Sequence, residues 1–247
     1  MNIRRLLAAS LIAAAGYATP AFAQDSCDAH FTRSQGMTDA LTEAFAAMQT
    51  RDAARMAKVL PEMESLLNAL PAAEIKPEVC NGDRINAYSR FHYARLNFLR
   101  ASGADTGFPN DLLIVKQPDL NHSSLAYATG WIKYEQGDFA GALAAFEKGL
   151  AIDPHSNELQ NEYLATLIQL HRYTDVVAYT DKTLMNEFDI TDELRAKLYK
   201  ARGVALFATD DLKSSLDALT VSLRYRYDDD TSNIEQQVKA ALAAKPN

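Results

Sequence analysis

The chain has 247 residues, with 25 basic and 32 acidic side chains and a formal charge of −7. This negative charge disfavours nucleic acid and anionic membrane surfaces as partners. Apolar residues make up 48% of the chain, which is ordinary for a globular protein, and no low-complexity tract argues for disorder.

Residues 1–23 follow the three-part pattern of a cleaved secretory signal. Arg4 and Arg5 form a basic start, an apolar stretch follows, and Ala21-Phe22-Ala23 supplies small residues for cleavage. The apolar stretch is short for a bilayer span, so we expect an exported chain that does not span the membrane after cleavage. The alanine-rich signal is typical of bacteria and predicts the periplasm, with secretion as the alternative. Loss of the two arginines, and of no acidic residue, takes the formal charge from −7 to −9.

Two cysteines, Cys27 and Cys80, lie beyond the predicted signal. An even number of cysteines in an oxidising compartment predicts a disulfide between them, and two unpaired thiols are the alternative. The spacing is far from a CxxC redox pair, so the bond is expected to be structural. Closing a loop of this length stabilises a fold by roughly 4 kcal/mol in the chain-entropy model.

From residue 38 onward, apolar residues recur with a helical period, and no alternating strand pattern is evident. The spacing predicts three helices, over Thr38–Gln49, from Asp52 to Pro71 and over Ile85–Leu99. Pro61 is expected to kink or restart the second of them. A short helix over Asn110–Lys116 would be the partner of the third. Residues 24–121 are therefore predicted to form degenerate helical hairpins.

The stretch from Ser123 to Pro154 has the clearest punctuation. Gly130 lies in the middle of a first helix, Gly137-Asp138 forms a turn, and Asp153-Pro154 ends a second helix. The second helix carries an apolar stripe at three-to-four spacing, made of Phe139, Ala142, Leu143, Phe146 and Leu150. A helix pair of this kind cannot bury its apolar face alone, so we expect it to stack on neighbouring pairs.

Two looser helix pairs follow the clear one. The first begins at Glu158 and turns at His171-Arg172, and the second begins near Ala196 with Gly203 in the place of Gly130. A last helix, Asn233–Ala244, mixes polar and apolar residues, as a helix that caps a repeat array does. This polar end favours a monomer.

Ser123–Pro154 resembles a tetratricopeptide repeat, whose period is about 34 residues. Four residues stand at consensus positions of that repeat: Gly130, Ala142, Phe146 and Pro154. The resemblance implies an all-α fold of helix-turn-helix repeats stacked as a right-handed α-solenoid with a C-terminal capping helix. The chain then divides into a signal (1–23), degenerate hairpins (24–121), tetratricopeptide-like repeats (122–230) and a capping helix with a tail (231–247). A plain helical bundle is the alternative.

In tetratricopeptide arrays, the first helix of each repeat lines a concave groove. The resemblance places seven side chains there: Tyr127, Trp131, Tyr134, Glu158, Asn161, Lys197 and Lys200. The three aromatic residues form a ridge at i, i+4 and i+7, which either anchors a peptide or helix of a partner or packs in the core.

The polar residues of this set have separate expected roles. Asn161 would hydrogen-bond an extended peptide backbone, and Lys197 and Lys200 would receive an acidic side chain or a C-terminal carboxylate. The carboxylate clamp of chaperone-binding relatives has Lys and Asn where this chain has Tyr127 and Trp131. Binding of a chaperone tail is therefore not predicted.

No catalytic motif is evident in the sequence. The five histidines are scattered, none at metal-ligand spacing from another His or Cys, and P-loop, dinucleotide and GxSxG patterns are missing. The sequence thus predicts a non-enzymatic scaffold of the bacterial cell envelope, without cofactor or metal, that binds another envelope protein or a peptide. The alternative is a glycan or small-ligand module that uses the aromatic ridge as a stacking platform.

Overall fold

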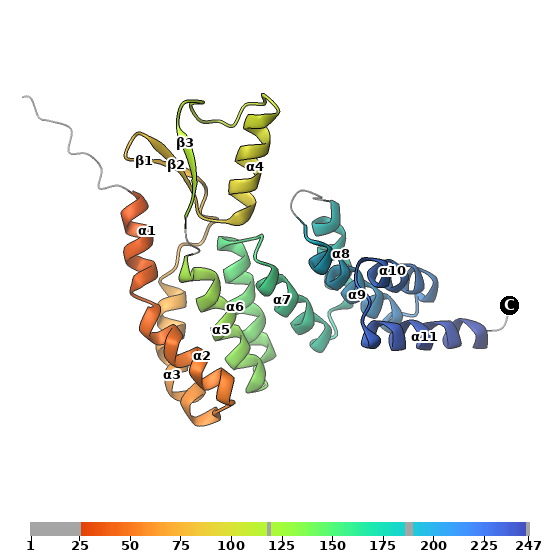
Figure 1. Cartoon of the computed structure of the whole chain (residues 1–247). Helices are drawn as coiled ribbons and strands as arrows, with labels where there is room; N and C mark the ends of the chain where they lie inside the picture. Colours follow the sequence, from red (N-terminus) through yellow and green to blue (C-terminus); the bar gives the residue numbers. More distant parts are fainter. Residues whose placement is uncertain (1–25, 118–119, 186–189, 246–247) are drawn as a thin grey trace, which may run out of the picture.

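The computed structural model describes residues 26–117, 120–185 and 190–245, which form eleven helices and three strands (Figure 1). The predicted signal, residues 1–23, lies outside the described residues. The fold is mostly helical, as the periodicity predicts. Among the described helices, none combines the length and apolar character that a membrane crossing requires.

Four pairs of helices stack one after another along the chain. They are α2 (Thr38–Thr50) with α3 (Ala53–Asn68), α5 (Asn121–Glu135) with α6 (Phe139–Ile152), α7 (Asn157–Gln169) with α8 (Tyr173–Met185), and α9 (Asp192–Ala208) with α10 (Leu212–Tyr225). The second helix of each pair also contacts the first helix of the next, and α11 (Asp229–Ala244) packs on α10 at the end. This is the pairwise packing of tetratricopeptide repeats, which the sequence predicts.

The helix boundaries follow from side chains that cap them. Asp138 accepts a hydrogen bond from the backbone N–H of Gly141 (2.9 Å) and starts α6, and Asp211 does the same for Ser214 (3.2 Å) at the start of α10. These bonds satisfy N–H groups that have no partner inside the helix. The helix predicted from Asp52 is continuous through Pro61 and does not restart there.

Glycine permits the close approach of the two helices in a pair. Gly130 lies against the ring of Phe146, where a Cβ atom would overlap the ring. Gly203 occupies the same place in its pair, and a Cβ there would lie 2.6 Å from Cγ of Leu219. The correspondence of these two glycines, predicted from the sequence, therefore has a packing cause.

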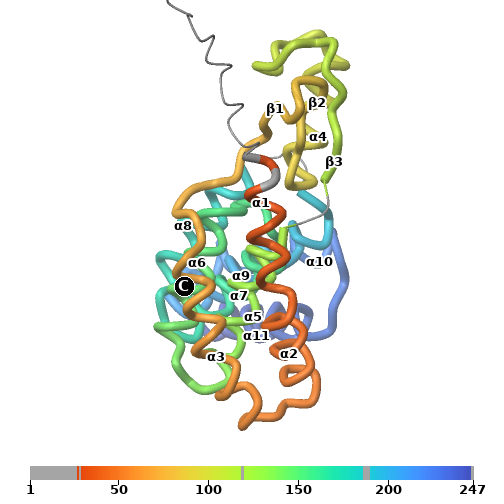
Figure 2. The backbone as a smooth tube through the Cα atoms, turned by 90° about the vertical axis from the view of Figure 1, so that its left-hand side faces the viewer, coloured from red at the N-terminus to blue at the C-terminus, as the bar shows by residue number. Residues whose placement is uncertain are grey.

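The segment between the first two helix pairs does not form the hairpin predicted from Ile85–Leu99 and Asn110–Lys116. It contains β1 (Glu78–Cys80), β2 (Arg84–Ala87), α4 (Arg90–Ala101) and β3 (Leu113–Lys116). The central strand β2 pairs antiparallel with β1 and parallel with β3. The prediction of helix for Ile85–Ala87 and for Asn110–Lys116 was therefore wrong. Figures 1 and 2 both show this segment, here called the αβ insert, projecting from one end of the helix pairs.

Local chemistry explains the difference between prediction and structure. Ser89 is extended (φ −127°, ψ 155°) and its hydroxyl accepts from the N–H of His92 (3.2 Å), so α4 begins only at Arg90. Ile85 and Ile114 are buried on adjacent strands against Leu96 of α4 and form a small core of the insert's own. Their β-branched side chains suit a pleated, half-buried sheet.

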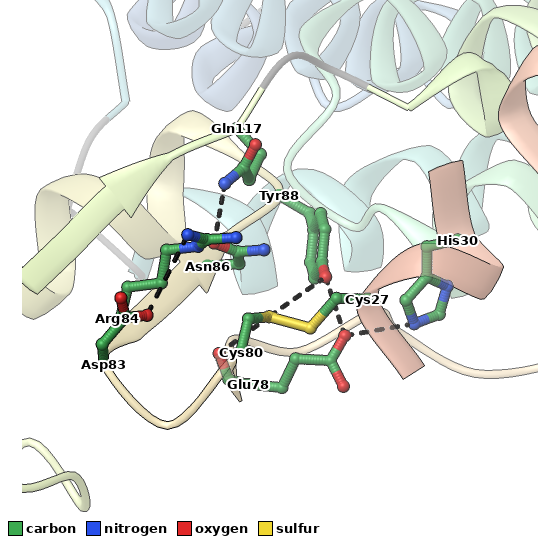
Figure 3. The surroundings of a disulfide bond; sticks show 9 residues. All are labelled: Cys27, His30, Glu78, Cys80, Asp83, Arg84, Asn86, Tyr88 and Gln117. Atoms are coloured by element: carbon green, nitrogen blue, oxygen red, sulfur yellow. Dashed lines mark hydrogen bonds and ion pairs between the residues drawn. A yellow bond between two sulfur atoms is a disulfide. The ribbon is translucent and has the colours of Figure 1, made fainter. Parts of the chain in front are cut away.

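The predicted disulfide between Cys27 and Cys80 is present (Figure 3). Cys27 lies on α1 (Ser26–Gln35), a helix that the sequence analysis did not predict, and Cys80 ends β1 and is fully buried. Beside the bond, the hydroxyl of Tyr88 donates to Oε1 of Glu78 (2.7 Å), and Nε2 of His30 lies 3.5 Å from the same oxygen. The disulfide therefore fastens the first helix to the αβ insert.

Candidate functional site

A groove runs across the first helices α5, α7 and α9, which lie next to one another along the array. It consists of a hollow of about 610 Å³ and a second of about 280 Å³. Four residues line both hollows: Tyr127, Asn157, Glu158 and Thr191. The two hollows are therefore parts of one continuous surface, here called the α5–α7–α9 groove.

Four of the seven predicted binding residues line this groove. Tyr127 comes from α5, Glu158 and Asn161 come from α7, and Lys197 comes from α9. Three successive helix pairs thus each contribute a side chain to one surface.

Trp131 and Tyr134 lie elsewhere. Neither side chain lines either of the two hollows. Both are half-buried and pack against the hydrophobic core shared by the first two helix pairs. The ring of Tyr134 meets Phe139 edge-on, with centroids 5.0 Å apart. Of the three residues of the predicted aromatic ridge, only Tyr127 lines the groove. For Trp131 and Tyr134, the alternative that they pack in the core agrees with the structure.

Lys200 also lies outside the groove. Its ammonium group forms ion pairs with Asp230 (2.8 Å) and Asp228 (3.3 Å) at the start of α11. Lys197 is paired with Glu193 one turn earlier on the same helix (3.2 Å). Both lysines that were expected to receive an acidic partner therefore already contact carboxylates of their own chain.

The wall at the other end of the groove was not predicted. There the αβ insert contributes Phe91, which stacks on His155 with ring centroids 3.4 Å apart and planes 11° from parallel. Phe45 of α2 also lines this hollow and is 40% exposed, although its spacing fits the apolar stripe of that helix. The sequence carries no signal for this wall, because Phe91 and His155 are 64 positions apart and belong to elements assigned to different repeats.

Carboxylates outnumber cations along the groove. Its lining includes Asp153, Glu158, Glu162 and Glu193, against Arg90 and Lys197. Burial raises the pKa of the half-buried Glu162, which a hydrogen bond from Asn161 and the charge of Lys197 offset only in part. The pKa of Tyr127 is raised by burial first and then by the charges of Glu162 and Glu158. The side chains that line the groove therefore carry a net negative formal charge.

Four of the histidines gather where the αβ insert meets α5 and α6, in contrast to their scatter along the sequence. Nε2 of His92 lies 3.0 Å from Oε1 of Glu74, and the ring lies edge-on to His155 (centroids 6.3 Å apart). His92 and His122 line one small cavity, and the charge of His30 acts on His122.

These histidines form no metal-ligand cluster within the described part of the chain. The three potential ligand atoms that come together there belong to Cys27, Glu78 and Cys80. Two of those atoms are the sulfurs of the disulfide, which are bonded to each other and do not offer thiolates. The four histidines thus belong to the contact region between the αβ insert and the helix pairs.

Residues 124–156 match the sequence model of the tetratricopeptide repeat family. The protein is thus one that contains a tetratricopeptide repeat, formed by α5, α6 and the turn into α7. None of the curated proteins matches the chain.

Two solved structures resemble part of the chain. The first tetratricopeptide domain of human RPAP3 is 18% identical, with a TM-score of 0.45 over 50% of this chain and 94% of that one. The first tetratricopeptide domain of Spaghetti (RPAP3), bound to the HSP90 peptide SRMEEVD, is 19% identical, with a TM-score of 0.43 over 49% of this chain and 94% of that one.

Proposed function

We propose that the protein is a non-catalytic scaffold of the bacterial cell envelope that holds a peptide, or an extended segment of a partner protein, in the α5–α7–α9 groove. The observation that carries this proposal is the continuity of the groove across three adjacent first helices, each of which contributes a side chain. A surface of this kind suits an extended ligand, because neighbouring repeats present successive contact points along it.

Two features support the envelope setting. Residues 1–23 have the sequence pattern of a cleaved secretory signal. The disulfide between Cys27 and Cys80 fits an oxidising compartment, since such bonds form and persist there.

The glycan-binding alternative has less support. It relied on Trp131 as the stacking platform, and this side chain packs against the hydrophobic core. The aromatic groups at the groove, Tyr127 and the stacked Phe91 and His155, are also suited to contact with protein side chains.

Site-specific crosslinking in the native envelope tests the proposal. A photo-reactive phenylalanine analogue replaces Asn161 in the groove, and a matched variant carries it at Ala144, an exposed residue of the second helix α6. We expect the groove probe to capture a protein segment that mass spectrometry maps to one sequence, and the α6 probe to miss it. The Tyr127→Ala change should remove the capture while the circular dichroism spectrum is retained. Equal capture at both positions would contradict a groove-directed function.

A further inference from the structure

The charges of the α5–α7–α9 groove are balanced at one end and unbalanced in the middle. At the α9 end, Glu193 is paired with Lys197 (3.2 Å) and also with Arg226 (2.8 Å). The cations of that end are therefore engaged with a carboxylate of the same chain. The two carboxylates of α7, Glu158 and Glu162, form no ion pair among the described residues, although the charge of Lys197 still acts on Glu162.

The hydrogen-bond partners of these two carboxylates are a hydroxyl and an amide. Ser156 Oγ donates to Glu158 (3.4 Å), and Asn161 Nδ2 donates to Glu162 (3.3 Å). The two glutamates are four positions apart on one helix and line the same hollow. Like charges at this spacing repel, and the burial of a charge costs folding free energy, which applies to the half-buried Glu162 but not to the exposed Glu158.

The dipole of helix α7 stabilises only one of these two carboxylates. Glu158 lies in the first turn of α7, where the N-terminal end of the dipole stabilises a negative charge. Glu162 lies one turn further along and receives little of this stabilisation, because the effect falls off within the first turn. The burial of Glu162 therefore has a free-energy cost that Asn161 and Lys197 offset only in part, and a positive charge from outside the chain would relieve it further.

Tyr127 completes the arrangement from the adjacent helix. It lines the same hollow as Glu158 and Glu162, and both of their charges act on its hydroxyl. An ammonium or guanidinium group between an aromatic ring and carboxylates gains from cation–π attraction and from charge-assisted hydrogen bonds.

We infer that the groove binds a positively charged segment, whose Lys or Arg side chains lie between Tyr127 and the carboxylates of Glu158 and Glu162. This inference rests on the proposed function and names the chemistry of the partner. It reverses the expectation from the sequence that Lys197 and Lys200 receive an acidic ligand. An acidic segment would meet four carboxylates and two cationic side chains along the groove. The negative charge of the whole chain, −7, attracts a cationic segment at long range as well.

Selection from a library of random short peptides, displayed without charge bias, tests this inference on the disulfide-bonded protein. The expected result is enrichment of Lys and Arg among the selected peptides, relative to the starting library. The affinity of these peptides should fall about tenfold or more in the double variant Glu158→Gln, Glu162→Gln, because charge-assisted contacts are lost. The control is Glu62→Gln with Asp217→Asn, which removes two exposed carboxylates of α3 and α10 outside the groove and should leave the affinity unchanged.

The outcomes separate the inference from the function on which it rests. If neutral or acidic peptides are selected and lose affinity with Tyr127→Ala, the groove binds peptides but the inferred charge preference is wrong. If the library gives no binder, or binders that ignore Tyr127→Ala, both the proposed function and this inference fail. Glu162→Lys adds a second readout, since it should turn the selection toward acidic peptides. An unchanged preference in that variant would overturn the inference.

Discussion

His122 is 1% exposed at the start of α5, and neither of its ring nitrogens has a hydrogen-bond partner among the described residues. Burial, followed by the charges of Arg33 and His30, lowers its pKa from 6.5 to about 4. In the unfolded chain the imidazole keeps its ordinary pKa, so the unfolded state takes up a proton first as the pH falls. The contribution of neutral His122 to stability is therefore fully present above about pH 6.5 and is lost progressively toward pH 4.

This linkage predicts that acidification destabilises the protein through His122. Between pH 7 and pH 5, the free energy of unfolding should fall by about 2 kcal/mol from this residue alone. Urea unfolding at the two pH values checks this in wild type and in His122→Leu, which lacks the titrating ring. The difference between their pH dependences isolates this residue from the neighbouring His92, whose pKa is also lowered, mainly by burial. Parallel pH dependences would contradict the assignment.

Phe146 is fully buried and lies against Gly130 in the clear repeat. Replacing it with alanine leaves a cavity that the tightly packed helix pair cannot fill. We expect Phe146→Ala to lower the free energy of unfolding by about 3–5 kcal/mol, read from the urea midpoint. Phe98→Ala removes the same ring from a site that is 59% exposed and should cost less than about 0.5 kcal/mol. Equal midpoints for the two variants would mean that the apolar stripe of α6 is not a packed core.

At the scale of single elements, the accuracy of the sequence prediction followed the strength of the local signals. The repeat formed by α5 and α6 was predicted because Asp138 caps its second helix and Gly130 stands where two helices touch. The αβ insert was missed because the apolar residues around Ile85 and Ile114 also fit a helical period. These segments form strands and not helices because β2 pairs with β3, which is distant along the chain. The spacing of apolar residues along the chain carries no information about such pairing.

The disulfide gives a prediction at the element scale. Cys27 and Cys80 are 53 positions apart, so the bond restricts a long loop of the unfolded chain. Replacing both with serine should lower the free energy of unfolding of the N-terminal part, from α1 to β2, by roughly 4 kcal/mol in the chain-entropy model. Hydrogen exchange should then accelerate in α1, β1 and β2, while α9 and α10, at the other end of the array, keep their protection. Uniform loss of protection along the whole chain would contradict a local role.

At the scale of the whole molecule, the positions within the repeat predict some features of the candidate site and leave others unpredicted. The repeat pattern identifies the inward positions of each first helix. Tyr127, Asn161 and Lys197 stand at such positions, and all three line one groove. The repeat pattern could not show that Lys200 is engaged by Asp230, which is 30 positions away on α11. It also could not show that the αβ insert would form an end wall with Phe91. The position of a residue within the repeat determines the helix face on which its side chain lies. The partners of that side chain depend on the full three-dimensional fold.

The position of the αβ insert between the first two helix pairs has a consequence for the order of folding. Asn121 at the start of α5 hydrogen-bonds Ser34, 87 positions earlier, through its backbone N–H and its side chain (2.9 and 2.8 Å). The N–H of Ile75 similarly reaches the carbonyl of Ile152 (3.3 Å). By contrast, α7 to α11 are joined mainly by contacts between successive helices. Contacts that close long loops form late, because the entropy of loop closure must be overcome first. The helices α7 to α11 can thus assemble among themselves, while the first helix pair reaches its partner α5 only after a long loop has closed.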